Sequence, residues 1–504
     1  MGQVIIKLKR PLDLCSDSVV NTLNSRRKRK ATADANNSHE ENNSYGSKTP
    51  KIRRLLSTTQ YIYQELYNEQ KTSDVTIMAL NKVWYLHKVY LSQSPYFSCM
   101  FNGSWQESCQ DFVHIIILDE NITLEALDAV FGSLYLGEIE IDDKSVISII
   151  AAATLFILDN IINKCTELMA DTINADTVIS YYDAACQYNC PIIRKSTFKW
   201  LEINLLSVYA KYRNILKYIS IDLMTALISS PDLYVIESEF SLYTMLRAWV
   251  YLRLHPDCDL EEFQGRKECQ QQQAQQPPLD MAAAFTGNDH SSHAIQSFFL
   301  KRKETSSFLL TLEGQQYLKP FRALRTQYLI TSYLGLKSIL NDNIIPKDWI
   351  HNHVMTHWSS ILKVNNLPEE GSQNLSLHKF NENSARAGRL VFGPERQKWC
   401  CAGIHSSLDL VLVCCSQVLK IRRHIASERK HLQNLQTESQ FMIRASITSV
   451  NAQRQPMFTQ KSTVTSLSLE KNEKVILIKM DPKLAYPLLV SVNLLVVPPT
   501  ASNV

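Results

Sequence analysis

The residues of this sequence best able to bind a metal or to act as nucleophiles are its cysteines, and their spacing favours neither role. The chain has 504 residues and 12 cysteines, and it has no CxxC pair. The closest spacings are Cys186/Cys190 and the doublets at 400–401 and 414–415. Tetrahedral zinc needs four converging ligands, usually supplied as two close pairs. We therefore interpret the thiols as small buried side chains in a reducing compartment, and we expect no metal and no cofactor.

Short motifs that mark catalytic sites are also missing. The sequence has no GxSxG, no HExxH, no GxGxxG after a strand and no GxxxxGK[ST]. A catalytic site would have to be assembled from scattered residues. We therefore predict that this protein is not an enzyme.

Cationic side chains gather in two clusters near the N-terminus. They are Arg26, Arg27, Lys28, Arg29 and Lys30, followed by Lys51, Arg53 and Arg54. Two short basic clusters in an extended chain are typical of a bipartite nuclear-import signal. The alternative is a solvated basic tail that carries no localisation signal. The rest of the chain is nearly neutral, which predicts no direct nucleic-acid binding.

The second residue is a candidate lipidation site. Met1-Gly2 permits N-myristoylation after removal of the methionine. The sixth residue is Ile6, where Ser or Thr is usual, so the signal is weak.

Composition predicts several folded domains. The chain is 45% hydrophobic, with 53 Lys+Arg against 49 Asp+Glu, which is too apolar and too balanced for a disordered protein. Residues 1–57 are the exception, because they are polar and have no periodic apolar pattern, and we predict a disordered basic tail. The longest apolar run, 147–158, is too short for a membrane span, and we expect a soluble, intracellular protein.

Strand signals precede helix signals from residue 61 onward. Residues 74–80 and 83–86 predict a hairpin with Asn81-Lys82 as its turn, and 112–118 predicts a further strand. Ser94-Pro95 predicts the start of a helix, and apolar spacing predicts helices over 124–135 and 146–158.

These residues resemble the BTB (POZ) domain, over residues 58–168. The resemblance rests on sequence landmarks in the expected order: Ser73-Asp74-Val75, Leu86-His87-Lys88-Val89-Tyr90-Leu91, Ser94-Pro95-Tyr96-Phe97, and Ala151-Ala152-Ala153. It implies a non-catalytic interaction module that forms homodimers.

Helical patterns continue beyond this domain. Residues 169–257 resemble the BACK domain through Asp176-Thr177-Val178, the run 184–190 and the segment 233–239. Residues 258–305 include glutamine and proline runs and predict a flexible insertion. Residues 306–370 predict a helical continuation of BACK. Residues 375–500 have short apolar and β-branched runs that predict a small antiparallel sandwich or barrel, at 390–392, 408–413, 441–447, 475–478 and 488–497. The fold class is thus multidomain α+β.

The whole chain resembles the germ cell-less family. The resemblance rests on Gln93-Ser-Pro-Tyr-Phe97, Gly103-Ser-Trp-Gln-Glu107, Ile344-Ile-Pro346 and Arg386-Ala-Gly-Arg389. It implies a role in germ-cell formation or gametogenesis, including spermatogenesis, and residence at the nuclear envelope or matrix with a cytoplasmic or plasma-membrane pool. It also implies protein clients that include a receptor kinase or lamina-associated proteins.

The BTB resemblance implies two contact sites. In BTB proteins that recruit cullin-3, a hydrophobic-x-Glu triplet lies in the loop after the helix that corresponds to Pro95–Phe101, and Trp105 and Glu107 match it. An exposed indole provides an apolar anchor, and the carboxylate adds orientation. In similar domains, residues matching Asp74, His87 and Lys88 lie near the dimer interface. For His87 alone we favour a hydrogen-bonded core histidine.

Two functions remain open from the sequence. We favour a substrate-recognition adaptor of a cullin-3 RING ubiquitin ligase. The alternative is a nuclear-envelope scaffold or transcriptional co-regulator that uses the BTB domain only to dimerise.

Overall fold

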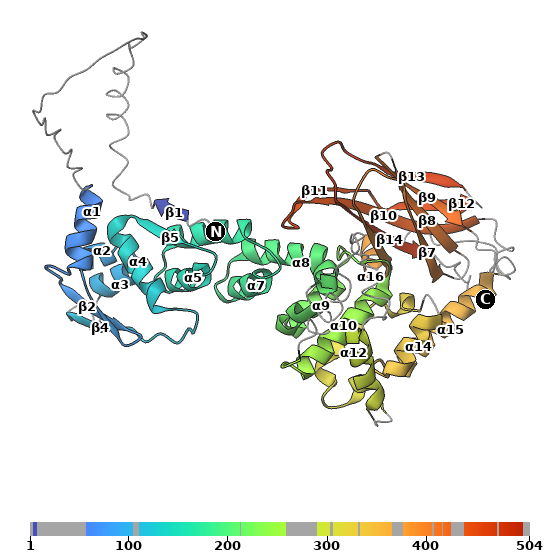
Figure 1. The fold of residues 1–504 in the computed structure, drawn as a ribbon, viewed down its shortest axis with the longest axis horizontal. Helices are drawn as coiled ribbons and strands as arrows, with labels where there is room; N and C mark the ends of the chain where they lie inside the picture. The colour runs from blue at the N-terminus through green and yellow to red at the C-terminus, as the bar shows by residue number, and fades with distance from the viewer. Residues whose placement is uncertain are drawn as a thin grey trace, which may run out of the picture. The chain divides into compact units, whose positions relative to one another are not determined.

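The structure is a computed structural model of the chain, and it describes most of the sequence outside the N-terminal tail and several connecting segments. The described residues are 4–7, 57–103, 110–211, 213–258, 290–302, 306–330, 333–364, 376–405, 408–415, 417–424, 438–470 and 473–496. They form two compact units (Figure 1). The first holds residues 1–172 and 183–193, and the second holds residues 173–182 and 194–504.

The first unit combines a small sheet with short helices. Its three-stranded sheet has the order β3-β2-β4, with β2 antiparallel to β3 and parallel to β4. The elements are α1 (Thr58–Ile62), η3 (Tyr63–Asn68), β2 (Val75–Ala79), β3 (Lys82–Leu86), α2 (Lys88–Leu91), α3 (Pro95–Asn102), β4 (Phe112–His114), α4 (Leu124–Leu136), β5 (Glu138–Ile141), α5 (Val146–Leu155) and α6 (Asp159–Asp171).

The predicted hairpin forms, with its turn one residue earlier than expected. Leu80 and Asn81 both have positive φ, 47° and 62°, so they are the two central residues of the turn. Lys82 already belongs to β3, where it pairs with Ala79. Ser94-Pro95 begins α3 as predicted, because the Ser94 hydroxyl accepts from the Phe97 N–H and the proline occupies the first turn.

The tail predicted over residues 1–57 contains one short described strand. β1 (Val4–Lys7) pairs antiparallel with β5, with Val4 opposite Ile141 and Lys7 opposite Glu138. An apolar, β-branched run beside a strand that has no other partner favours this pairing. The other residues of the tail, up to 56, lie outside the described residues.

The core of the first unit is aromatic. Phe97 and Phe156 stack with ring centroids 5.1 Å apart, and Phe131 lies 5.3 Å from Phe156. All three side chains are fully buried. They pack α3, α4 and the end of α5 against one another, which fixes the positions of these helices in the first unit.

The second unit starts with helices. α7 (Val178–Gln187) and α8 (Pro191–Lys211) have parts in both units. The others are η5 (Arg213–Tyr218), α9 (Ile221–Ser229), α10 (Glu239–Leu254), α12 (His290–Lys301), η7 (Phe308–Leu310), η8 (Gln315–Tyr317), α13 (Leu318–Arg322), η9 (Thr326–Tyr328), α14 (Tyr333–Asp342), α15 (Lys347–Val364) and α16 (Leu377–Asn383). α12 lies within the insertion predicted for 258–305, and its apolar residues Ile295 and Phe299 are buried. None of the described helices combines the length and hydrophobicity needed to cross a bilayer.

Two antiparallel sheets complete the second unit, confirming a β-rich C-terminal part. One sheet has the strand order β11-β10-β14-β6, and β12 also pairs with β10. The other sheet has the strand order β13-β9-β8-β7. The strands are β6 (Ala385–Val391), β7 (Gln397–His405), β8 (Leu408–Cys415), β9 (Val418–His424), β10 (Glu438–Val450), β11 (Pro456–Lys461), β12 (Thr465–Glu470), β13 (Lys474–Lys479) and β14 (Leu488–Val496). Their inward residues share one buried core, so the sheets form a sandwich (Figure 1).

Candidate functional site

Asp74 and Lys88 lie close together in the first unit, but they are not an ion pair. The Asp74 carboxylate accepts a hydrogen bond from the backbone N–H of Lys88 at 2.7 Å. It therefore caps the N-terminus of α2, whose N-cap residue, His87, makes no side-chain capping hydrogen bond. The Lys88 ammonium turns instead to Asp111, with an N–O distance of 3.5 Å, and to the face of Phe101.

His87 is buried inside the first unit and has a partner at each ring nitrogen. Nε2 lies 2.8 Å from the carbonyl oxygen of Lys71, and Nδ1 lies 3.1 Å from the hydroxyl of Tyr135. A carbonyl oxygen can only accept, so this network assigns a proton to Nε2. His87 thus connects the segment before β2 to α4. A dimer role for Asp74, His87 and Lys88 stays a prediction.

The other predicted site residues lie outside the described part of the chain. Trp105 and Glu107 belong to the segment between α3 and β4, which is described only up to Gly103 and from Gln110 onward. Gly2 and both basic clusters, at 26–30 and 51–54, belong to the tail outside the described residues. Their roles stay predictions.

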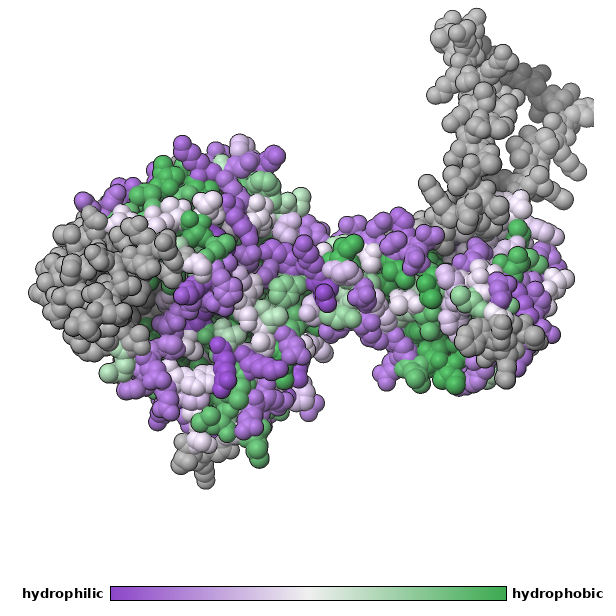
Figure 2. Space-filling view, turned by 180° about the vertical axis from the view of Figure 1, so that it is seen from behind, coloured by the Kyte–Doolittle hydropathy of each residue, from purple (hydrophilic) through white to green (hydrophobic). Residues whose placement is uncertain are grey.

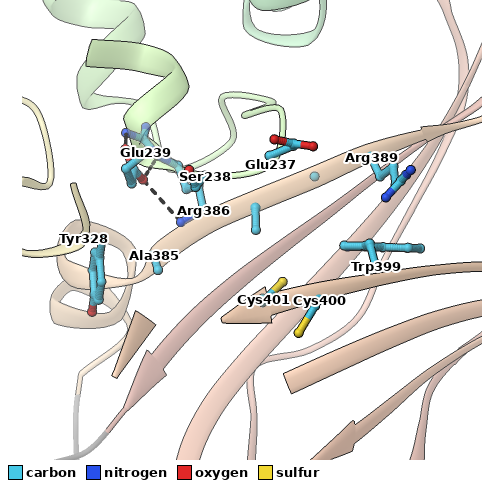
Figure 3. A pocket seen from close by; sticks show the side chains of 12 residues that line it. Glu237, Ser238, Glu239, Tyr328, Ala385, Arg386, Arg389, Trp399, Cys400 and Cys401 are labelled. Atoms are coloured by element: carbon cyan, nitrogen blue, oxygen red, sulfur yellow. Dashed lines mark hydrogen bonds and ion pairs between the residues drawn. The ribbon is translucent and has the colours of Figure 1, made fainter. Parts of the chain in front are cut away.

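A cavity of about 350 Å³ opens in the second unit between β6 and β7 (Figure 3). These are the end strands of the two sheets, so the cavity lies at one side of the sandwich. Its lining combines charged, aromatic and sulfur-containing side chains: Glu237, Ser238, Glu239, Tyr328, Ala385, Arg386, Ala387, Gly388, Arg389, Trp399, Cys400 and Cys401.

A buried ion pair forms one wall of this cavity. Glu239 Oε1 accepts from Arg386 Nε at 2.8 Å, and Oε2 accepts from Arg386 Nη2 at 2.9 Å. Arg386 Nη1 donates to the carbonyl oxygens of Ile228 and Ser230 at 2.9 and 2.7 Å. Both side chains are at most 1% exposed. The pair is therefore bidentate and fully hydrogen-bonded, which is the arrangement that makes a buried charge tolerable.

The local structure explains how the pair is brought together. Glu239 is the first residue of α10, where the helix dipole favours a carboxylate. Gly388 lets β6 approach the segment before α10, because a Cβ there would lie 2.7 Å from both the Tyr234 ring and the Val235 carbonyl oxygen. The Glu237 N–H donates to the Gly388 carbonyl at 3.0 Å, so this segment covers the edge of β6.

The opposite wall is made by β7. Trp399 and Cys401 point toward the core, and the indole Nε1 of Trp399 is buried without a hydrogen-bond partner among the described residues. Burial raises the pKa of the Cys401 thiol to about 12. The thiol is therefore neutral at physiological pH and a poor nucleophile. The Glu239 carboxylate is likewise fully engaged in hydrogen bonds, so neither Cys401 nor Glu239 is available for nucleophilic or acid–base chemistry.

Asp232 joins the helical part of the second unit to its sandwich. Its carboxylate lies 2.7 Å from Lys461 Nζ and 3.3 Å from Arg444 Nη2. Burial opposes ionisation, but the hydrogen bond from Lys461 and the charges of Lys461, Lys199 and Arg444 prevail and lower the pKa of Asp232. The carboxylate is thus stabilised in its charged form.

Similarity to known proteins defines the class of this chain. Residues 63–173 match the BTB/POZ domain family, and these residues form the hairpin, parallel strand and helices of the first unit. The chain is therefore a BTB-domain protein. The match accords with a protein-interaction module, for which dimerisation is the general mode.

Full-length relatives identify the family. The chain is 51% identical over 484 residues to "Protein germ cell-less" of Drosophila melanogaster, covering 96% of this chain and 84% of the relative. It is 30% identical over 462 residues to human "Germ cell-less protein-like 1", covering 90% and 84%. This chain belongs to the germ cell-less family. A more distant relative, human "Kelch repeat and BTB domain-containing protein 2", is 24% identical over 174 residues, covering 34% and 27%.

Sequence reasoning missed the Glu239–Arg386 pair. The two residues are 147 positions apart, so no local spacing connects them. One signal was available, since Arg386 stands in a strand of small residues that continues into Leu390-Val391. A charge in a strand of this composition needs a buried partner.

Proposed function

We propose that this chain is a non-catalytic substrate-recognition adaptor of a cullin-3 RING ubiquitin ligase. The observation that carries the proposal is the BTB domain at residues 63–173 in a chain of the germ cell-less family. Trp105 and Glu107 fall between α3 and β4 of that domain. There they match the hydrophobic-x-Glu triplet of BTB proteins that recruit cullin-3.

In this proposal the adaptor promotes ubiquitin transfer by bringing the client close to the enzyme that modifies it. The BTB domain binds the cullin, and the second unit holds the client. The adaptor raises the effective concentration of client lysines beside a ubiquitin-charged enzyme. Its own residues make and break no bond.

A BTB-mediated homodimer would double the client-binding sites and add avidity. The first unit has apolar surface that such contacts could use (Figure 2). Its exposed large apolar side chains include Val83, Tyr85, Val89, Phe112, Ile116 and Leu118. Val89 follows Lys88 directly and is 72% exposed, which places an apolar anchor beside the predicted dimer residues.

Family membership and the basic tail support a proposal for the cellular setting. We propose a role in germ-cell formation, with residence at the nuclear envelope and with a receptor kinase or lamina-associated proteins as clients. The basic clusters at 26–30 and 51–54 would supply nuclear import.

Replacing Arg26 to Lys30 with Ala should abolish nuclear accumulation of a fluorescent fusion, and unchanged accumulation would refute the import signal.

The cullin contact is tested by co-precipitation of cullin-3 with the wild-type chain and with Trp105→Ala/Glu107→Ala. We expect the wild type to retain cullin-3 and the double variant to lose at least about tenfold in affinity, as hot-spot residues do. Tyr218→Ala is the matched control, because it removes an exposed aromatic side chain of the second unit, away from the loop and from the predicted dimer residues. Equal retention by the double variant would refute the contact, and no retention by the wild type would favour a scaffold that uses the BTB domain only to dimerise.

A further inference from the structure

A second hollow, of about 380 Å³, lies on the outward face of the sheet β13-β9-β8-β7. Its lining is partly apolar, with Val413, Cys415 and Ile421. Five cationic residues line it, and no Asp or Glu is among its lining residues. We name this site the basic hollow, and its cations are Arg396, Lys398, Lys420, Arg422 and Lys474.

Strand register explains why these cations are neighbours. Lys398 on β7 and Lys420 on β9 both pair with Val413 on β8, so the two lysines flank one valine in the same row. Arg422 on β9 lies directly opposite Lys474 on β13 in the next row. Residues paired in this way share one face of the sheet. The cluster is therefore built by the sheet itself rather than by chance contacts of loops.

The arrangement costs stability. Like charges directly opposite each other on neighbouring strands repel. Among the described residues, none of the five cations has an ion pair with a carboxylate, whereas Lys461 and Arg444, on the other sheet, both form ion pairs with Asp232. A surface that keeps uncompensated charge at a cost in folding is the pattern expected of a binding site.

We propose that the basic hollow binds an acidic, carboxylate-rich peptide segment of the client protein. The inference rests on the proposed adaptor function, because it names the chemistry by which the sandwich selects a client. Glu and Asp side chains of an extended segment would neutralise Lys398, Lys420 and Arg422. Aliphatic parts of the segment would cover the apolar lining at Val413.

A peptide fits the hollow better than nucleic acid does. Single strands are bound through aromatic side chains on which bases stack, and none lines the hollow. Binding to a duplex needs cations along an extended track, whereas these five are confined to one concavity. β7 is moreover the end strand of its sheet, the position at which extended peptides commonly dock.

The test measures fluorescence anisotropy of a fluorescein-labelled, glutamate-rich peptide titrated with the full-length chain at low salt. Its glutamine-for-glutamate counterpart, a single-stranded DNA oligonucleotide and vesicles of anionic phospholipid are the competing probes. We expect the glutamate peptide to bind and to be weakened by salt. The variant Lys398→Glu/Lys420→Glu should lose at least about tenfold in peptide affinity.

The matched control is Lys195→Glu/Lys479→Glu, which changes the net charge equally at exposed lysines outside the hollow. It should keep the wild-type affinity within about twofold. The melting temperature of the hollow variant should equal or exceed that of the wild type, because repulsion is relieved. Lys398→Gln/Lys420→Gln provides a second variant with milder charge change, and it should also weaken binding.

Equal loss in the hollow and control variants would overturn the proposal, as would preferential binding of the oligonucleotide or of the vesicles. Cullin-3 co-precipitation with the same variants separates the two claims. Retained cullin binding with lost peptide binding supports the basic hollow. Peptide binding that depends on Lys398 and Lys420, in a chain that never retains cullin-3, refutes the adaptor function and leaves the anion site standing.

Discussion

Arg386 combines full burial with full hydrogen bonding, and its stability contribution depends on Glu239. Removing one partner of such a pair leaves an uncompensated charge in a site with little access to water. Every guanidinium contact of Arg386 reaches residues between 228 and 239. The pair therefore anchors β6 to the helical segments of the second unit.

Glu239→Ala should lower the free energy of unfolding by about 3–5 kcal/mol, because it leaves the buried charge of Arg386 without its carboxylate partner. Denaturant titration followed by circular dichroism measures this change. Lys164→Ala, which breaks the exposed pair of Lys164 with Glu167, is the control and should cost less than about 1 kcal/mol. Equal costs for the two variants would contradict the burial argument.

Asp232 makes stability depend on pH in the acid range. Its pKa in the folded chain lies below the ordinary value of 3.8, so its contribution is present above that value. The contribution is lost as pH falls through the folded-state pKa. Asp232→Asn should lower stability at neutral pH by about 1 kcal/mol and should flatten the loss of stability below pH about 4. Thermal melts of both proteins across this range measure the effect, and parallel pH profiles would refute it.

Gly388 determines how closely β6 can approach the segment 234–237. A larger side chain must displace either the Tyr234 ring or backbone carbonyls, because a Cβ would lie 2.7 Å from Tyr234 Cε2. Gly388→Val should therefore cost about 1–3 kcal/mol and should speed hydrogen exchange of the Glu237 amide. Gly393→Ala is the matched control, since nothing lies within 4 Å of its Cβ. Unchanged exchange at Glu237 would show that this contact does not hold β6.

The sequence predicted elements with strong local signals and missed those held by distant pairing. Ser94-Pro95 marked the start of α3, and the β-branched residues of 488–497 marked β14. β11 (Pro456–Lys461) was missed because none of its side chains is fully buried, so it has no clear apolar periodicity, and its place depends on pairing with β10. β9 was missed because an inward-facing arginine, Arg423, interrupts its apolar alternation.

The candidate sites also differ in whether the sequence alone could reveal them. The contact residues Trp105 and Glu107 were available from a motif, because they are neighbours in sequence. The basic hollow was not, since Lys398, Lys420 and Lys474 come from three strands. Only the register of those strands places their charges on one face. A site assembled by sheet register leaves no mark in a linear sequence.

At the scale of the whole molecule, the two units carry separable tasks in the proposed adaptor. The first contains the BTB domain, to which we assign the proposed cullin and dimer contacts, and the second contains the sandwich with the cavity at β6 and β7 and the basic hollow. Variants in one unit should therefore leave the other unit's binding unchanged. Such independence is expected when each unit has its own core.

Light scattering coupled to size-exclusion chromatography tests the central claim most directly. The purified chain should elute as a dimer with twice the 57.7 kDa mass of one copy. With excess cullin-3, it should form a larger complex that holds one cullin per chain. Trp105→Ala/Glu107→Ala should keep the dimer mass and lose the complex. A wild-type chain that shows no mass increase with cullin-3 would contradict the adaptor function.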